Sequence, residues 1–380
     1  MKKKAKICLN TMVANESHVI LRMLESCWKY IDYWIIQDNG SKDGTQQLIT
    51  NFFAEKEIEG FLYETNWQYP GINRDDALQK CLVANHGCDW ILRIDADESI
   101  QVSDDFDWSL LEDNSIQSFN IMASQGNCIY HRCWLWNAKL PWKFKHDKRH
   151  EIIYLDGVGE GFQRYPMPDG FRHVVFGDGK SWFNPTKFYG DALEIEKDLL
   201  TSGKMKSDFY HLFYIAKSYR DAVLSTDSNW PFGVIHRDEC TRRAIFFFER
   251  YLDTAHDYGK NKDPKYIDEM GYISLISISE CYRLMGQHEK SLNCLSEAEK
   301  FCPERNEHLL EMAHVFLDIG ENLDALRVLI RASSPERKNP FPNYTLFLNN
   351  DAYCDTGDYI HHLCQEIHQI IVEKSLIIQQ

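Results

Sequence analysis

Short apolar runs separated by longer mixed segments open this chain. The runs at residues 5–13, 31–37 and 88–92 are rich in Ile, Leu, Val, Trp and Cys, and polar residues follow each of them. Runs of this length and composition are typical of buried strands, and the segments between them are long enough for helices. The order of strand, helix, strand, helix predicts a parallel sheet that binds ligands at the carboxyl ends of its strands.

The turn after the second run, residues 38–45, is dense in Asp, Asn, Gly and Ser. Its two glycines permit a tight backbone, and Ser41, Asp43 or Thr45 can cap the helix that follows. Backbone amides at such a helix start can face an anionic ligand. A plain capped turn is the alternative interpretation.

An acidic pair, Asp95-Ala96-Asp97, follows the third run. Two acids one residue apart on extended backbone share one face. Their hard oxygen ligands suit Mg²⁺ or Mn²⁺ that shares its coordination shell with substrate phosphates. On its own the pair is a weak indication, because acidic pairs are common in ordinary loops.

The second half of the chain has helical periodicity and contains a repeat. Three pairs of identical residues lie 34 positions apart: Gly286 and Gly320, Leu292 and Leu326, Ala298 and Ala332. This is the tetratricopeptide period, in which pairs of helices stack on neighbouring pairs. Residues 209–219 and 243–248 resemble a degenerate earlier repeat whose aromatics are expected in its core. We therefore predict domains at 1–200 and 201–380.

Composition narrows the class of protein. The chain has 380 residues, no apolar run of transmembrane length, and no cleavable leader pattern, so we expect a cytoplasmic protein of two domains. Its twelve cysteines include no CxxC pair, which favours free thiols over a zinc site. A net charge of −15 disfavours a broad nucleic-acid surface, although the basic stretch at 139–149 leaves a phosphate-bearing acceptor open.

Four segments, in this order along the chain, resemble the motifs of family 2 glycosyltransferases, which have the A-type nucleotide-sugar fold. They are Val13-Ala14-Asn15-Glu16, Asp38 to Thr45, Asn73-Arg74-Asp75-Asp76-Ala77 and Asp95-Ala96-Asp97-Glu98. The resemblance implies an α/β domain with a Rossmann-like mixed sheet, followed here by an all-α tetratricopeptide-like domain.

The resemblance also implies roles for individual residues. Residues 13–16 and Asp38 would contact the base and ribose of the donor, and Arg74 would face the diphosphate. Asp97 would bind the Mn²⁺ or Mg²⁺ that bridges the phosphates, with Asp95 nearer the ribose. The implied nucleotide-sugar positions are Val13, Asn15, Glu16, Asp38, Gly40, Ser41, Asp43, Arg74, Asp95, Ala96 and Lys187.

Three of these interpretations keep an alternative. Arg74 is otherwise a surface helix residue paired with a neighbouring aspartate. Lys187, proposed to close over the diphosphate, is otherwise a solvated helix start. The aromatic faces of Trp134, Trp136 and Trp142 can stack on a sugar or acceptor, and buried core positions are the alternative.

The combination of the two domains resembles the subgroup that includes the peptide S-glycosyltransferases of bacteriocin pathways. The aromatic segment of that subgroup ends in a His-Glu pair, which this chain has at His150 and Glu151. Glu151 is the candidate base for the acceptor, with support of a strand or loop as its alternative. His173 is the candidate third metal ligand and His150 its rival. The subgroup tends to have Gly after its Trp, where this chain has Lys143.

These observations predict a metal-dependent, inverting glycosyltransferase that uses a nucleoside diphosphate sugar, with a UDP-sugar favoured. The expected acceptor is a peptide, a protein or a glycan, because stacked helical repeats offer a concave surface. Glycosylation of a hydroxylated nucleobase in DNA, an inactive repeat scaffold and a nucleotidyltransferase are the alternatives. The terminal repeats either cap the array or join chains into an oligomer.

Overall fold

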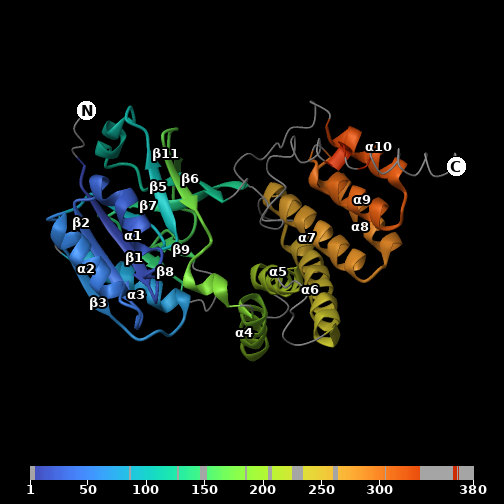
Figure 1. Cartoon of the computed structure of the whole chain (residues 1–380), viewed down its shortest axis with the longest axis horizontal. Helices are drawn as coiled ribbons and strands as arrows, with labels where there is room; N and C mark the ends of the chain where they lie inside the picture. Colours follow the sequence, from blue (N-terminus) through green and yellow to red (C-terminus); the bar gives the residue numbers. More distant parts are fainter. Residues whose placement is uncertain are drawn as a thin grey trace. The chain divides into compact units, whose positions relative to one another are not determined.

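The computed structural model describes residues 5–84, 87–125, 128–145, 152–184, 186–203, 208–224, 234–259, 264–303, 305–333, 363–365 and 367. The chain forms two compact units, residues 1–184 and 185–380 (Figure 1). The first is an α/β unit and the second is helical, as the sequence predicts. The division falls before the helix at 187–202, whereas the boundary expected at residue 200 lies within that helix.

The first unit contains eleven described strands. They are β1 Ile7–Val13, β2 Tyr33–Asp38, β3 Gly60–Glu64, β4 Trp90–Arg93, β5 Glu98–Val102, β6 Ser118–Gln125, β7 Cys128–Asn137, β8 Trp142–Phe144, β9 Ile153–Leu155, β10 Arg164–Pro166 and β11 Phe171–Val175. Its helices are α1 Ile20–Cys27, α2 Thr45–Glu55 and α3 Pro70–Val83, with short 3-10 turns η1 Trp28–Tyr30, η2 Trp108–Glu112 and η3 Lys180–Phe183.

Nine of these strands form a mixed sheet in the order β3-β2-β1-β4-β7-β6-β11-β5, with β10 paired to β6. β1, β2 and β4 are parallel, as predicted, and β3, which was not predicted, pairs in parallel with β2. β7 then joins β4 in the antiparallel direction. In the register of β1 and β2, Val13 lies opposite Asp38, and in that of β1 and β4, Asn10 lies opposite Arg93. Three strands therefore end at one edge of the sheet.

Both faces of the sheet are covered because successive residues of each buried strand point to opposite sides. Ile7 and Leu9 of β1 pack with α1 and α2 in one core, whereas Cys8 packs against α3 in the other. Trp136 and Trp142 are fully buried in this second core. The core alternative therefore holds for these two tryptophans, which offer no exposed stacking surface.

The second unit consists of seven described helices: α4 Lys187–Ser202, α5 Phe209–Leu224, α6 Val234–Gly259, α7 Pro264–Leu284, α8 His288–Phe301, α9 Glu307–Asp318 and α10 Asn322–Ala332. α5 packs on α6, α7 on α8, and α9 on α10, and each pair contacts the next. Gly286 and Gly320 have φ values of 69° and 81° in the turns within the last two pairs. Glycine is favoured there because this backbone region is costly for other residues.

The repeated apolar positions lie inside the helical unit as expected. Ala298 and Ala332 are buried, and the expected aromatic core of the earlier repeat includes Phe247 and Phe248. Phe246 is instead exposed. None of the helices in the described part of the chain is long and apolar enough to cross a membrane.

Candidate active site

Two loops at the shared edge of β1, β2 and β4 are joined by hydrogen bonds between side chains and backbone. The Asn15 amide donates to Ser41 Oγ (2.8 Å), and the Lys42 amide donates to Asn15 Oδ1 (2.9 Å). Asn15 has a φ of 59°, a region that Asn tolerates better than most residues. The Glu16 amide donates to Thr45 Oγ1 (2.9 Å). These bonds fix the position of the first loop against the start of α2.

Asp43 completes this junction. Its Oδ2 accepts from the Ser17 amide (2.9 Å) and its Oδ1 from Thr45. Burial alone would raise the pKa of Asp43, but the hydrogen bonds from Thr45 and Ser17 outweigh it and hold the pKa well below the ordinary range. Asp43 therefore remains ionised as a structural anchor of the loop.

Asp38 ends β2 with a carboxyl group whose two oxygens have different surroundings. Oδ1 accepts from the amides of Gly40 (2.9 Å) and Ser41 (2.8 Å) and from Gln46 Nε2 (3.0 Å). Oδ2 is buried and has no hydrogen-bond partner among the described residues. A buried acceptor without a donor is costly, so this oxygen is suited to a donor group on a ligand.

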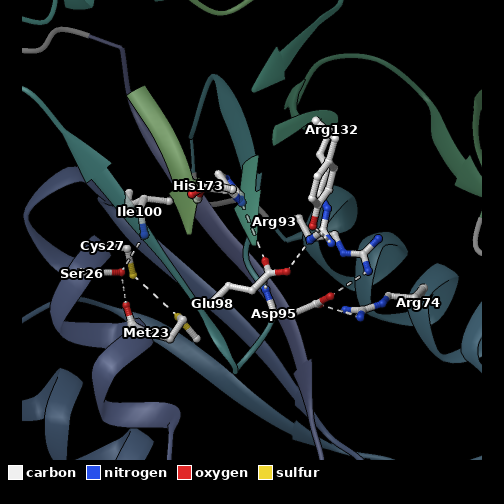
Figure 2. A network of polar contacts seen from close by, with 12 residues as sticks. Met23, Ser26, Cys27, Arg74, Arg93, Asp95, Glu98, Ile100, Arg132 and His173 are labelled. Carbon is white, nitrogen blue, oxygen red and sulfur yellow. Dashed lines mark hydrogen bonds and ion pairs between the residues drawn. The ribbon is translucent and has the colours of Figure 1, made fainter. Parts of the chain in front are cut away.

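The acidic pair divides into two environments. Asp95 forms ion pairs with Arg74 (2.6 Å) and Arg93 (3.3 Å) (Figure 2). Burial alone would raise the pKa of Asp95, but the charges of Arg74 and Arg93 outweigh it and hold the pKa well below its usual range. Arg74 is only 8% exposed, so it is a buried residue of α3 and the surface alternative is wrong.

Glu98 organises the other side of the network in Figure 2. One of its oxygens pairs with Arg132, and the other accepts from the Asp95 amide (3.2 Å). Arg132 also donates to Tyr130 (2.7 Å), and its guanidinium lies 4.2 Å from the ring centre of Trp134. Glu98 is 2% exposed. Glu98 is therefore a buried acceptor that fixes the backbone at Asp95, the first acid of the pair.

His173, predicted as a metal ligand, lies on β11 inside this network. It is fully buried, with Nδ1 3.8 Å from Glu98 Oε2 and its ring at an edge to Trp134. Burial lowers the pKa of His173 despite the opposing effect of Glu98, so the imidazole is neutral. Among the described residues, no group of three or more His, Cys, Asp or Glu side chains is arranged to hold a metal. The structure thus does not gather Asp95, Asp97 and His173 into one metal cluster.

Asp97 lies near enough to the Glu16 carboxylate for the charge of Asp97 to act on it. Burial and the charges of Asp95 and Glu98 raise the pKa of Asp97. Burial raises the pKa of Glu16 to about 7, and the nearby charge of Asp97 adds to this against the opposing hydrogen bond from the Lys180 amide. Two hard carboxylates with an excess of negative charge fit Mg²⁺ or Mn²⁺, which proteins often bind through one or two carboxylates and substrate phosphates.

A cavity of about 350 Å³ lies beside these groups, lined by Asn15, His18, Asp43 and Lys180. Asn15 and Asp43 were predicted at this site, but His18 and Lys180 were not. Glu98 stands within the fourth motif. Its partner Arg132 lies in the aromatic segment, and the sequence does not predict their contact, because only the sheet topology places β7 beside β4.

The other residues predicted at the site do not all lie at this edge of the sheet. Val13 ends β1, Gly40 has a φ of 93° in the turn after β2, and Ala96 is buried between the two acids. Lys187 is the first residue of α4, in the second unit. The candidate base and the rival ligand, Glu151 and His150, lie outside the described residues.

Comparisons with known proteins bear on this edge of the sheet. Residues 11–105 match the family model described as Glycosyl transferase family 2. This match covers the end of β1 and all of β2 and β4, and it includes Asp38, Asp95 and Asp97. A comparison with curated proteins gave no match.

Solved structures show distant similarity. TarS 1-349 of S. aureus has 12% identity over 78% of this chain and 91% of its own, with a TM-score of 0.36. The same protein in complex with UDP has 13% identity over 78% and 90%, with a TM-score of 0.34. The Sgt2 TPR domain from Aspergillus fumigatus has 15% identity over 42% and 81%, with a TM-score of 0.27. All three TM-scores lie below 0.5, so no residue's role is taken from them.

Proposed function

Because the N-terminal part of this chain is a glycosyl transferase family 2 domain, matched over residues 11–105, we propose that the protein transfers a sugar from a nucleoside diphosphate sugar. The observation that carries the proposal is the convergence of Glu16, Asp38 and the Asp95-Asp97 pair at the carboxyl edge of three adjacent strands. Ligands of open α/β sheets bind at this edge. A UDP-sugar is the favoured donor.

Asp38 is proposed to receive the nucleoside. Its buried Oδ2 has no donor among the described residues, whereas Oδ1 is occupied by the turn that follows. A ring N–H or a ribose hydroxyl would satisfy this acceptor. Arg74 is proposed to face the diphosphate, and its pairing with Asp95 fixes its position before the donor binds.

Asp97, with Glu16 beside it, is proposed to hold the divalent metal. When bound, Mn²⁺ or Mg²⁺ would offset the negative charge that develops on the departing diphosphate. Asp95 and His173 do not fit as further ligands, because arginines hold Asp95 and His173 is buried against Glu98. The role of the protein is to keep the two carboxylates fixed and close to the nucleotide.

The acceptor is proposed to be a peptide, a protein or a glycan. Glu151 is the proposed base that takes its proton, so that attack from the face opposite the diphosphate inverts the sugar. The free thiols of the described cysteines favour a reducing compartment such as the cytoplasm.

Release of nucleoside diphosphate from UDP-, GDP- and dTDP-sugars tests the proposal. Asp97→Asn keeps the shape of the side chain but removes its charge, and we expect it to reduce release by about a hundredfold or more. EDTA should have a similar effect on the wild type, and Mn²⁺ should reverse it. Asp105→Asn, at an exposed position, is the matched control and should behave as the wild type.

Three results would contradict this function. Release that is unaffected by both EDTA and Asp97→Asn would exclude the metal at Asp97. No release from any donor, together with no donor binding by calorimetry, would favour the repeat scaffold. Release of pyrophosphate would instead identify a nucleotidyltransferase.

A further inference from the structure

Residues 176–180, which follow β11, fold over the two carboxylates of the proposed metal site. The Phe176 amide donates to the Asp97 carbonyl (3.1 Å), and the Gly179 amide donates to Asp97 Oδ2 (3.3 Å). The Lys180 amide donates to Glu16 Oε2 (3.0 Å). Consecutive main-chain amides thus contact one carboxylate each.

A partly exposed ion pair joins this segment to α1. Arg22 donates to both oxygens of Asp178, at 2.8 and 2.5 Å. The Arg22 guanidinium also lies 3.8 Å from the ring centre of Phe176. His18 Nε2 is 2.9 Å from the Asp178 carbonyl. A bidentate pair of this kind fixes orientation as well as distance.

The backbone of the segment is adapted to this position. Gly177 has a φ of 67°, which other residues rarely adopt. A Cβ on Gly179 would lie 3.0 Å from Asp97 Cγ, so a larger residue here would have to displace the Asp97 side chain by a few tenths of an ångström. The contact between Gly179 and Asp97 is therefore close enough to orient the carboxylate.

We propose that Arg22 and Asp178 are positioning residues of the transferase, which hold the Gly179 and Lys180 amides against Asp97 and Glu16. This inference rests on the proposed function, since it concerns the same two carboxylates. Without the amides, the like charges of Asp97 and Glu16 would repel and their side chains would move apart. The ion pair acts through the segment at 176–180 and does not itself need to touch the donor.

A double-mutant cycle tests the proposal. Arg22→Gln and Asp178→Asn each remove the ion pair, and Arg22→Lys keeps the charge but loses the bidentate geometry. Hydrogen–deuterium exchange of the peptide that contains residues 176–180 reports on the segment without any substrate. Nucleoside diphosphate release gives KM and kcat for the donor, and thermal unfolding identifies a variant that fails to fold.

Each single variant should speed exchange at residues 176–180 and raise the donor KM by about ten- to a hundredfold, with a smaller change in kcat. The double variant should change the exchange rate and the donor KM no more than either single variant, because each substitution removes the same interaction. Arg22→Lys should recover only part of the wild-type KM, because lysine keeps the charge but cannot form the bidentate pair. The exposed pair Asp324 and Arg327 on α10, 2.6 Å apart, is the control, and its neutral double variant should change neither readout.

Additive effects of the two single variants on exchange would overturn the proposal, as would wild-type exchange in both of them. An unchanged donor KM with faster exchange would also overturn it, because the segment would then not position the site. If the wild type released no nucleoside diphosphate, the proposed function would fail, and the exchange data would still decide whether the ion pair holds the segment.

Discussion

Glu16 illustrates how neighbours at the candidate site change the chemistry of a single residue. Its pKa in the folded protein is about 7, against an ordinary value of 4.5. The folded state thus binds the proton more tightly than the unfolded state. This contribution to the free energy of unfolding is fully present below pH 4.5 and is lost as the pH rises through about 7.

Glu16→Gln should remove that pH dependence. We expect the difference in the free energy of unfolding between this variant and the wild type to grow in favour of the variant from pH 4.5 to above pH 7. Urea titrations at several pH values measure this difference. Glu112→Gln, at an exposed site, is the control. A difference that does not vary with pH would contradict the assigned surroundings of Glu16.

The sequence predicts the position of a site residue best where neighbouring residues alone determine it. The positions of Asp38 and of the Asp95-Asp97 pair after buried strands follow from apolar runs and turns alone. The different surroundings of Asp95 and Asp97 do not follow from such local patterns, because Arg74 reaches Asp95 from α3, which is distant in the sequence. We expected His173 to be a metal ligand. Side chains alternate along β11, and this alternation places the His173 ring in the buried network beside Glu98.

At the scale of elements, β3 depends on one glycine. A Cβ on Gly60 would lie 2.3 Å from the Trp34 carbonyl oxygen and 2.4 Å from its indole ring. Trp34 cannot move away easily, because it stacks on Phe53 with ring centres 4.4 Å apart and donates to the Ile58 carbonyl. Close pairing of β2 and β3 therefore requires a residue without a side chain.

Gly60→Ala should lower the free energy of unfolding of the first unit by about 2 kcal/mol through this overlap. Chemical denaturation followed by tryptophan fluorescence measures the change. Gly161→Ala is the matched control, because a Cβ there meets no atom within 4 Å. Equal stability of the two variants would show that β2 and β3 are not paired as described.

Strands β1, β2 and β4, the repeat and its turn glycines could be predicted because each has a local signal. The antiparallel strands β7 and β5 could not, since they are joined to the parallel part through long-range pairing. The sequence alone also leaves open whether the tryptophans around Trp136 pack in the core or stack on a ligand. Trp136 and Trp142 fill the second core, where they pack against other apolar residues and offer no surface to a ligand.

At the scale of the whole molecule, two units with separate cores should unfold separately. Nine of the ten tryptophans lie within residues 1–184, and Trp230 is the tenth. Tryptophan fluorescence therefore reports mainly on the α/β unit, and the circular dichroism of helices reports largely on the second unit.

A bound donor should stabilise only the unit that holds it. With a UDP-sugar at a hundred times its Kd and Mn²⁺ present, the free energy of unfolding measured by fluorescence should rise by about 2.7 kcal/mol. The main circular dichroism transition should change little. Equal shifts of both transitions would indicate that the donor also binds the helical unit or that the two units unfold together.

The most direct measurement is calorimetric titration of UDP into the wild type and Asp38→Asn, with Asp105→Asn as the control. The Asn keeps the Oδ1 acceptor of the turn and replaces only the buried Oδ2 with a donor. We predict one UDP bound per chain of the wild type and control, and an affinity lower by about tenfold or more in Asp38→Asn. Equal affinities, with all three proteins folded, would contradict a nucleotide site at this edge of the sheet.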